Sequence, residues 1–182
     1  NKLEQRQIAG VCIEDKIFPK TNSFLEKNIQ PLADIDEFCG KIKVAKDTQK
    51  DRDFCVIARI ESFIAGYDIK VALERAEAYR RSGADAILVH SKKINSSEIE
   101  LFMKEWSGRS PIIIVPTKYY NTPTEIFEDL KISVAIWANQ SIRASVTAIQ
   151  DVTKKIYLNR NISSVQDEIV PISEIFRLQK AD

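Results

Sequence analysis

The sequence predicts an α/β fold of the (β/α)8 TIM-type barrel class, with about five strand–helix units in this chain of 182 residues. Short runs rich in Val and Ile recur along the chain, and each is followed by a polar loop and an amphipathic helical pattern. The runs are continuously apolar, which is typical of parallel strands that are buried on both faces. Polar residues follow every run, and barrel enzymes assemble their sites at that edge of the sheet.

Five runs have the length and composition of buried strands. They lie near Gly10–Ile13, Phe54–Ile60, Asp85–Val89, Pro111–Val115 and Ser133–Ala138. An open doubly wound sheet also alternates strands with helices, but its site usually needs a Gly-rich first turn. The sequence contains neither GxGxxG nor GxxxxGK followed by Ser or Thr, so we favour the barrel.

The first helix has a clear start signal. Asp34 is followed three residues later by Glu37, a pattern that favours a capped N-terminus. The apolar residues after it fall on one helical stripe: Ile35, Phe38, Cys39 and Ile42.

The other helices are bounded by similar signals. Asp68 is expected to begin a helix that closes at Gly83, and Ser97 to cap one that ends at Gly108 with Trp106 in the core. Thr122, Pro123 and Glu125 predict a start with proline at the first helical position and a capping box. A long helix is expected at about Ser141–Tyr157.

A complete barrel takes eight units in about 250 residues. We therefore expect residues 1–160 to form a partial barrel. Residues 161–182 are expected to form a C-terminal extension with a short helix near Ser173–Gln179.

Composition excludes two classes of partner. The 27 basic and 26 acidic residues give a net charge of +1, so no bulk field for nucleic acid or an anionic membrane is expected. No apolar run approaches the roughly 20 residues of a membrane span, and no secretory leader opens the chain, which favours a cytoplasmic setting.

Cys12, Cys39 and Cys55 lack CxxC spacing and are expected to be reduced core residues.

The densest polar run follows the first strand. Within Glu14–Ser23 lie two carboxylates, two amines and an amide: Glu14, Asp15, Lys16, Lys20 and Asn22. Arg59 and Glu61 end the second strand, and His90, the only histidine, follows the third with Lys92 and Lys93.

The run Glu14-Asp15-Lys16, five residues, then Asn22-Ser23 matches the EDKxxxxxNS signature, and further segments match in the same order: Val56–Phe63, Gly83–Lys93, Pro116–Tyr120 and Ile136–Asn139. Through these residues the sequence resembles the phosphoenolpyruvate mutase and phosphonopyruvate hydrolase branch of the isocitrate lyase superfamily. The likeness covers nearly the whole chain.

The resemblance implies a Mg2+-dependent isomerase that interconverts phosphoenolpyruvate and phosphonopyruvate, forming the carbon–phosphorus bond of phosphonate biosynthesis. It implies that Arg59 binds the anionic substrate and that His90 contacts substrate oxygens. It also implies that Lys20, Asn22 and Ser23 lie on a loop that closes over the substrate, where Asn22 donates to the phosphoryl group.

By the same resemblance, Glu14 would act on the metal through water, accepting hydrogen bonds from metal-bound water and so orienting the ion. The first strand would be the fourth of the barrel, so these would be the last five units. The Asp-rich loop that supplies the direct metal ligand in the family has no counterpart here. We therefore expect a fragment of a longer enzyme that is inactive on its own. A homo-oligomer that exchanges its C-terminal helix, Ser141–Tyr157, is also implied.

Two other functions remain open. One is phosphonopyruvate hydrolase or a related 2-oxo acid lyase, although lyases of the superfamily carry a Cys-containing KKCGH-like loop where Lys16–Asn22 has no cysteine. The other is a non-catalytic half-barrel that serves as a binding or assembly module.

Each candidate residue also has a purely structural interpretation. Glu14 and Asp15 can be ordinary loop carboxylates, and Arg59 can be a strand residue that is paired with Glu61 or Glu14. His90 can be a core histidine. Lys92 and Lys93 are interpreted as a solvated loop rather than a phosphate clamp. Asn139 and Arg143 can be either ligands or capping and surface groups.

Overall fold

The computed structural model describes residues 1–23 and 31–180, in two compact units, Asn1–Ala138 and Asn139–Asp182. The predicted boundary at residue 160 falls within the second unit.

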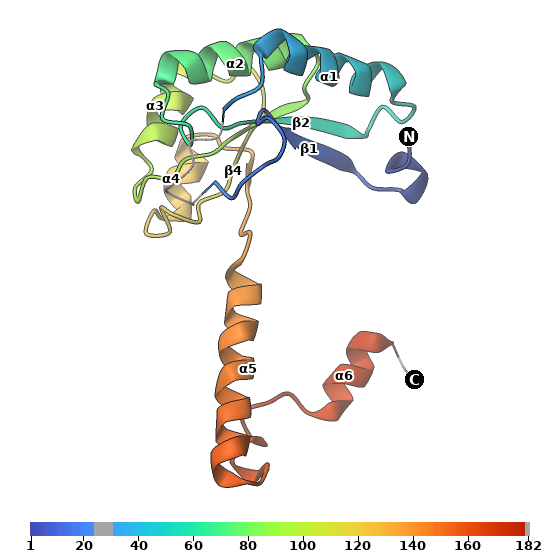
Figure 1. The fold of residues 1–182 in the computed structure, drawn as a ribbon, viewed down its shortest axis with the longest axis vertical. Coiled ribbons are helices and arrows are strands. Elements are labelled where there is room, and N and C mark those ends of the chain that lie inside the picture. The colour runs from blue at the N-terminus through green and yellow to red at the C-terminus, as the bar shows by residue number, and fades with distance from the viewer. Residues whose placement is uncertain (24–30, 181–182) are drawn as a thin grey trace. The chain divides into compact units, whose positions relative to one another are not determined.

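The first unit contains a five-stranded sheet in the order β1-β2-β3-β4-β5, and every neighbouring pair is parallel (Figure 1). The strands are β1 (Gly10–Glu14), β2 (Cys55–Ile60), β3 (Ala86–Val89), β4 (Ile112–Ile114) and β5 (Val134–Ala135). All five predicted strands are therefore present. Sequential order with helical crossovers is the topology of a (β/α) barrel wall.

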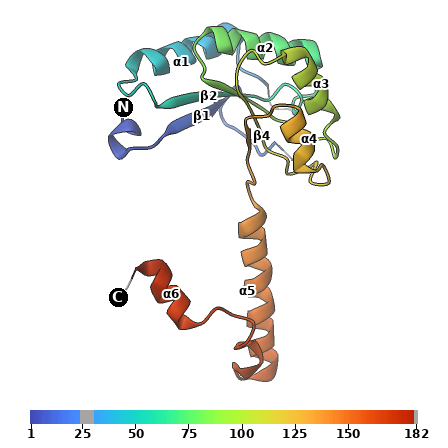
Figure 2. The ribbon, with the colours of Figure 1, turned by 180° about the vertical axis from the view of Figure 1, so that it is seen from behind.

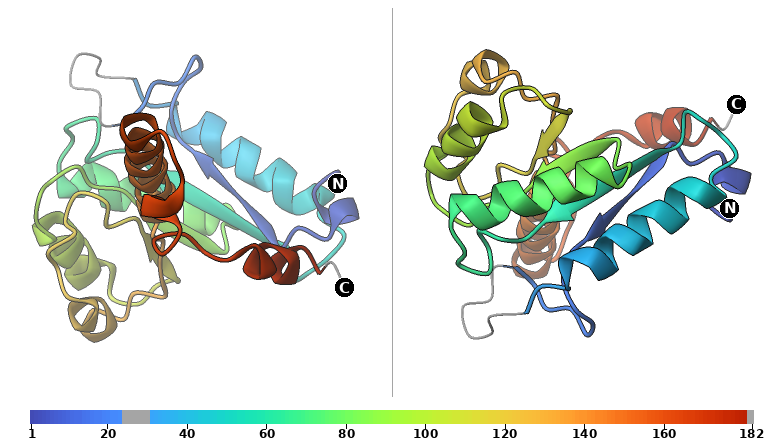
Figure 3. Two further views of the ribbon diagram at one scale, coloured as in Figure 1. Left: turned by 90° about the horizontal axis from the view of Figure 1, so that it is seen from below. Right: turned by 90° about the horizontal axis from the view of Figure 1, so that it is seen from above.

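Four helices connect the strands: α1 (Ile35–Thr48), α2 (Ile69–Arg81), α3 (Ser97–Trp106) and α4 (Thr124–Asp129). A single turn, η1 (Glu4–Arg6), precedes β1. Figures 1 and 2 show α1 and α2 on the same side of β1 and β2, and Figure 3 shows them side by side. The helices thus cover one face of the sheet.

The main core lies between the helices and that face. The helices contribute large buried side chains, including Phe38, Tyr79, Phe102 and Trp106, as expected for Trp106. The strands contribute Ala58, Ile60, Ile87, Val89, Ile112 and Ile114. Burying these side chains is the dominant favourable term in folding this unit.

The other face of the sheet holds the alternate residues. Ala86, Leu88 and Ile113 form a smaller cluster there with Ile57 and Val115. Arg59 pairs in register with Leu88 on β3 and with Glu14 on β1. Because side chains alternate along a strand, this is the face from which Arg59 projects.

Cys12 and Cys55 correct one prediction. Both are exposed, and only Cys39 of the three free thiols is buried. Cys12 pairs in register with Ile57, on the face opposite the helices. An apolar strand pattern does not distinguish the two faces of a sheet, which is why Cys12 and Cys55 were expected in the core.

The start signals of α1 and α2 are confirmed. Asp34 Oδ1 accepts hydrogen bonds from the backbone N–H groups of Asp36 and Glu37, at 2.9 and 3.0 Å. Asp68 Oδ1 accepts one from Val71 N at 3.1 Å. Such caps satisfy donors that have no partner within the helix.

The start of α3 was predicted one residue too late. Ser96 is the N-cap residue and makes no side-chain cap bond, while Ser97 is the first helical residue. The Asn95 carboxamide oxygen accepts from Ser97 N at 3.2 Å instead. An Asx turn at Asn95 therefore precedes the helix, in place of the cap that was expected from Ser97.

The start of α4 was also misplaced. Pro123 is the N-cap residue rather than the first helical residue, and no side-chain cap bond forms there. Its backbone is extended, with ψ 149°, so the helix begins at Thr124 and the capping box with Glu125 is not made.

The second unit consists of α5 (Gln140–Asn159), the single turn η2 (Ser163–Val165) and α6 (Ile172–Gln179). Both predicted helices are present. Along α5, Val146 and Ile149 are exposed and Val152 and Ile156 are half-buried. Within residues 1–23 and 31–180, no helix has the length and apolarity that a membrane span requires.

Candidate functional site

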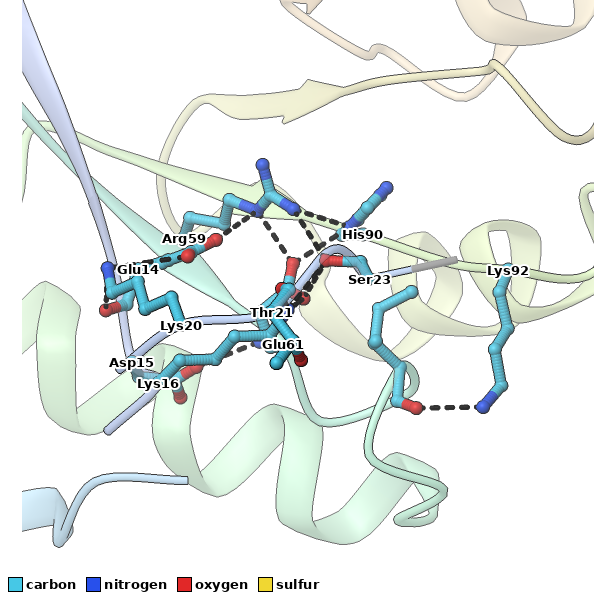
Figure 4. A network of polar contacts seen from close by, with 11 residues as sticks. Glu14, Asp15, Lys16, Lys20, Thr21, Ser23, Arg59, Glu61, His90 and Lys92 are labelled. Atoms are coloured by element: carbon cyan, nitrogen blue, oxygen red, sulfur yellow. Dashed lines mark hydrogen bonds and ion pairs between the residues drawn. The ribbon is translucent and has the colours of Figure 1, made fainter. Parts of the chain in front are cut away.

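A connected polar network lies at the carboxyl ends of β1, β2 and β3 (Figure 4). Glu14 is the last residue of β1, and Arg59 is the penultimate residue of β2. Glu61 and His90 are the first residues after β2 and β3. Parallel strands end at the same edge, so these side chains converge there, as the sequence predicted.

Arg59 is at the centre of the network. Its Nε lies 2.6 Å from Glu61 Oε1 and 3.3 Å from Glu14 Oε2. Its Nη2 lies 2.8 Å from His90 Nδ1 and 3.3 Å from Ser23 Oγ. Nη1 has no hydrogen-bond partner among the described residues.

The ion pairs required by a purely structural interpretation of Arg59 are thus present, with both Glu61 and Glu14. The side chain nevertheless keeps 24% of its surface exposed. A guanidinium has five donors in a rigid fork, so these contacts leave donors for an anionic ligand.

Within the described part of the chain, the Glu61 side chain has four partners in the site, as many as that of Arg59. Its Oε1 accepts from Arg59 Nε and lies 2.8 Å from His90 Nδ1. Its Oε2 lies 2.9 Å from Lys16 Nζ and accepts from Ser23 Oγ at 2.7 Å. Only 1% of the side chain is exposed.

The Glu61 carboxylate is ionised. Burial acts to raise its pKa, but the hydrogen bonds and charges of His90 and Arg59 outweigh burial and hold the pKa far below its ordinary range. A buried carboxylate with several donors keeps its charge where an isolated one would take up a proton.

His90 is buried, with 4% of its side chain exposed. Its Nδ1 is close to a donor, Arg59 Nη2, and to an acceptor, Glu61 Oε1. In the neutral ring, Nδ1 either donates or accepts, so the tautomer decides which contact is a hydrogen bond. His90 is therefore as buried as a core histidine, but its partners are site residues.

The segment after β1 brings two further predicted residues to the site, Lys20 and Ser23. Lys20 Nζ lies 3.3 Å from Glu14 Oε1, and 32% of the Lys20 side chain is exposed. Ser23 Oγ bonds to Glu61 and is within reach of Arg59. Asn22 is exposed and precedes Ser23 in the chain.

Lys16 belongs to the site but was not selected from the sequence. Its Nζ donates to Ser23 Oγ at 2.7 Å and to the backbone oxygen of Thr21 at 3.4 Å. Only 3% of its side chain is exposed. Lys16 and Glu61 thus form a buried ion pair.

Asp15 is not an ordinary loop carboxylate, because it is fully buried. Its Oδ2 accepts from Arg75 Nη1 at 3.0 Å and from Tyr79 OH at 2.9 Å, and its Oδ1 accepts from Glu61 N at 2.9 Å. Burial raises the pKa of Asp15, although these hydrogen bonds and the Arg75 charge oppose the rise. Asp15 joins the end of β1 to α2 and to Glu61.

The two lysines that follow β3 have their partners outside this network. Lys92 Nζ donates to the backbone oxygen of Ile64, and Lys93 pairs with Glu98 while 53% exposed. Asn139 occupies the N-cap position of α5, which its capping interpretation requires, but its side chain makes no cap bond. Arg143 is exposed.

The site offers one carboxylate that water can reach. Glu14 is 19% exposed, and its two oxygens face Lys20 and Arg59. Across residues 1–23 and 31–180, no three His, Cys, Asp or Glu side chains group as metal ligands do. The described donor set therefore does not fit direct coordination of Mg2+, which takes near-octahedral oxygen ligands.

Most of the chain matches one protein family. The sequence profile of the family described as phosphoenolpyruvate phosphomutase matches residues 1–157. The chain is 55% identical over 181 residues to phosphoenolpyruvate phosphomutase of Tetrahymena pyriformis, covering 100% of this chain and 60% of that protein.

Two solved structures are also similar. The crystal structure of phosphoenolpyruvate phosphomutase from Streptomyces platensis subsp. rosaceus superposes with a TM-score of 0.94 at 40% identity, over 97% of this chain and 61% of that one. A phosphonopyruvate hydrolase in complex with oxalate and Mg2+ superposes with a TM-score of 0.89 at 38% identity, over 97% of this chain and 60% of that one. The chain thus spans about three fifths of the length of each.

Proposed function

Because the chain belongs to the phosphoenolpyruvate phosphomutase family, we propose that the protein carrying it interconverts phosphoenolpyruvate and phosphonopyruvate. In this isomerisation the bond from phosphorus to the enol oxygen breaks and a bond from phosphorus to carbon 3 forms, with no other reactant. The observation that carries the proposal is the Arg59 guanidinium, held by Glu61 and Glu14 beside His90 with Nη1 unpaired among the described residues.

The charges of the site support an anionic substrate. Three cationic side chains, Lys16, Lys20 and Arg59, face two carboxylates, Glu14 and Glu61. The balance is one positive charge before His90 is counted. Both proposed substrates carry a carboxylate and a phosphoryl group, and charged donors at a partly buried site stabilise such groups more strongly than water does.

We assign the roles as follows. Arg59 binds the carboxylate or phosphoryl oxygens through its free donors, and His90 hydrogen-bonds substrate oxygens. Lys20 is exposed enough to turn from Glu14 to the substrate. Asn22 donates its amide to the phosphoryl group as that group moves, and Ser23 anchors the segment.

We further propose that the complete protein uses Mg2+, as the oxalate complex of the hydrolase contains it. Bound Mg2+ would polarise substrate oxygens. Glu14 would accept a hydrogen bond from metal-bound water, a role suited to a single, partly exposed carboxylate. The direct ligands would come from residues other than those described.

The hydrolase is the second candidate, since a solved hydrolase is nearly as similar as a solved mutase. A lyase is less well supported because Lys16–Asn22 lacks the cysteine of the lyase loop. Phosphorus NMR separates the first two: from phosphonopyruvate, a mutase makes phosphoenolpyruvate, whereas a hydrolase consumes water and releases inorganic phosphate with pyruvate.

Four further statements are proposals of the same kind. They are a role in phosphonate biosynthesis, a cytoplasmic location, a homo-oligomer that exchanges α5, and a division into a partial barrel, 1–160, and an extension, 161–182. The exposed apolar side chains of α5, Val146 and Ile149, support the oligomer, because such a stripe gains free energy when another surface covers it.

A further inference from the structure

The two oxygens of the Glu61 carboxylate bind two different groups of residues. Oε1 faces Arg59 and His90, the proposed substrate-binding pair, at 2.6 and 2.8 Å. Oε2 faces Lys16 and Ser23, in the segment after β1, at 2.9 and 2.7 Å. Figure 4 draws Glu61 together with the residues of both groups.

We propose that Glu61 is a positioning residue that couples the placement of the Lys16–Ser23 segment to the orientation of Arg59 and His90. The inference rests on the proposed function for its catalytic meaning, because Arg59 and His90 are the residues assigned there to the substrate. Glu61 itself need not touch the substrate.

The physical basis is the sharing of one buried negative charge among four donors. Charge-assisted hydrogen bonds strengthen as competing donors leave, because the charge concentrates on those that remain. When Ser23 and Lys16 bond to Oε2, the hold of Oε1 on Arg59 and His90 is weaker. When the segment moves away, that hold tightens.

Hydrogen bonding holds the backbone of Glu61 in place, so a change at one carboxylate oxygen is not absorbed by movement of the Glu61 backbone. Its N–H donates to Asp15 Oδ1 at 2.9 Å, and Asp15 is bound in turn by Arg75 and Tyr79 of α2. Glu61 follows directly on the strand residue Ile60, which is buried in the main core. A change in the hydrogen bonds to Oε2 therefore alters the hydrogen bonds to Oε1.

The His90 ring reports the coupling. Its Nδ1 donates to Glu61 or accepts from Arg59, and the strength of Glu61 as an acceptor biases the choice. A stronger acceptor favours the form that carries a proton on Nδ1. Moving the segment should therefore change the tautomer balance of this ring.

The test uses the complete natural protein, labelled with 15N-histidine, and the ring resonances of His90 are assigned by their loss in His90→Asn. Lys16→Met removes a donor to Oε2, and among the described residues Lys16 contacts Glu61, Thr21 and Ser23 rather than Arg59 or His90. We expect Lys16→Met to shift the His90 Nδ1 resonance toward that of the tautomer with its proton on Nδ1. In a Glu61→Gln background, the same substitution should shift it several-fold less.

Glu98→Gln is the matched control. Glu98 is also a carboxylate beside the end of β3 and bonds to Ser91 and Lys93, but not to the His90 ring. It should leave the ring resonances unchanged. An absence of any shift in Lys16→Met, or an equal shift in the Glu61→Gln background, would overturn the proposal. If Glu61→Gln does not fold, the comparison of the His90 ring resonances in Lys16→Met and Glu98→Gln tests the proposal alone.

Kinetics provide the second readout. Glu61→Gln should lower kcat by about 10- to 100-fold, as expected for misplaced reacting groups, and raise KM by a smaller factor. If the unmodified protein converts neither substrate, the proposed function fails, while the ring resonances still test the coupling. If it does convert them and Glu61→Gln has unchanged kcat, the positioning role fails alone.

Discussion

Glu14 and Arg59 are register partners at the ends of β1 and β2, and Glu14 Oε2 lies 3.3 Å from Arg59 Nε. The pairing of adjacent parallel strands thus places a carboxylate beside the guanidinium that we assign to the substrate. Glu14 shares Arg59 with Glu61, which holds the same nitrogen at 2.6 Å. Both carboxylates lie at Nε, and Nη1 has no hydrogen-bond partner among the described residues.

Arg59→Lys is expected to lower kcat/KM by about 100-fold or more, because an ammonium cannot hold two carboxylates and still offer a planar fork to the substrate. Steady-state kinetics of the complete protein measure this. Arg80→Lys is the control, since Arg80 pairs with Glu77 on α2 away from the site, and its kinetics should match the unmodified protein. Equal loss in both variants would contradict the assignment.

Asp15→Ala is expected to lower the free energy of unfolding by about 3–5 kcal/mol. It leaves Arg75, Tyr79 and the N–H of Glu61 without their buried acceptor. Denaturant unfolding measures the change. Glu37→Gln, which breaks only the exposed pair with Lys41, should cost at most about 0.5 kcal/mol. A similar small cost for Asp15→Ala would show that the network does not stabilise the fold.

The stability difference between the unmodified protein and Glu61→Gln should depend on pH. The folded pKa of Glu61 lies far below its value of 4.5 in the unfolded chain. Ionised Glu61 therefore contributes stability that is fully present above about pH 4.5 and is lost as the pH falls toward the folded pKa. Unfolding at pH 7 and at decreasing pH should show the difference shrinking. A difference that stays constant would mean that Glu61 is not held ionised by His90 and Arg59.

The isolated chain of 182 residues is expected to show no turnover of either substrate. Its described residues offer Glu14 but no grouped set of metal ligands, and the relatives that it matches are longer. The chain and the complete protein should be assayed side by side with added Mg2+. Turnover by the chain alone would refute this expectation. If the complete protein also shows no turnover but still binds the substrate, the result would favour a non-catalytic module.

Much of the fold was predictable because its signals are local. Continuous Val and Ile runs predicted all five strands, and Asp34 and Asp68 predicted two helix starts through bonds to residues two or three positions away. The barrel class and the family resemblance are both confirmed. The starts of α3 and α4 were misplaced because Asn95 and the extended Pro123 determine them instead.

The site was only partly predictable. Arg59 interrupts an apolar run, and His90 is the only histidine of the sequence, so both stood out, whereas Glu61 drew notice only as a partner for Arg59. Its other contacts, with Lys16, Ser23 and His90, join residues 29 or more positions apart or depend on how the segment after β1 folds back. The one available signal was its spacing of two from Arg59, which puts both side chains on the same side of the chain.

The most direct test of the central claim is phosphorus NMR of the complete protein with phosphonopyruvate labelled with 13C at carbon 3. Intramolecular transfer to oxygen breaks the carbon–phosphorus bond. We predict that the large one-bond coupling between carbon 3 and phosphorus disappears as a phosphoenolpyruvate signal grows, with no inorganic phosphate. Loss of the same coupling with inorganic phosphate as the only phosphorus product would contradict the claim and identify a hydrolase.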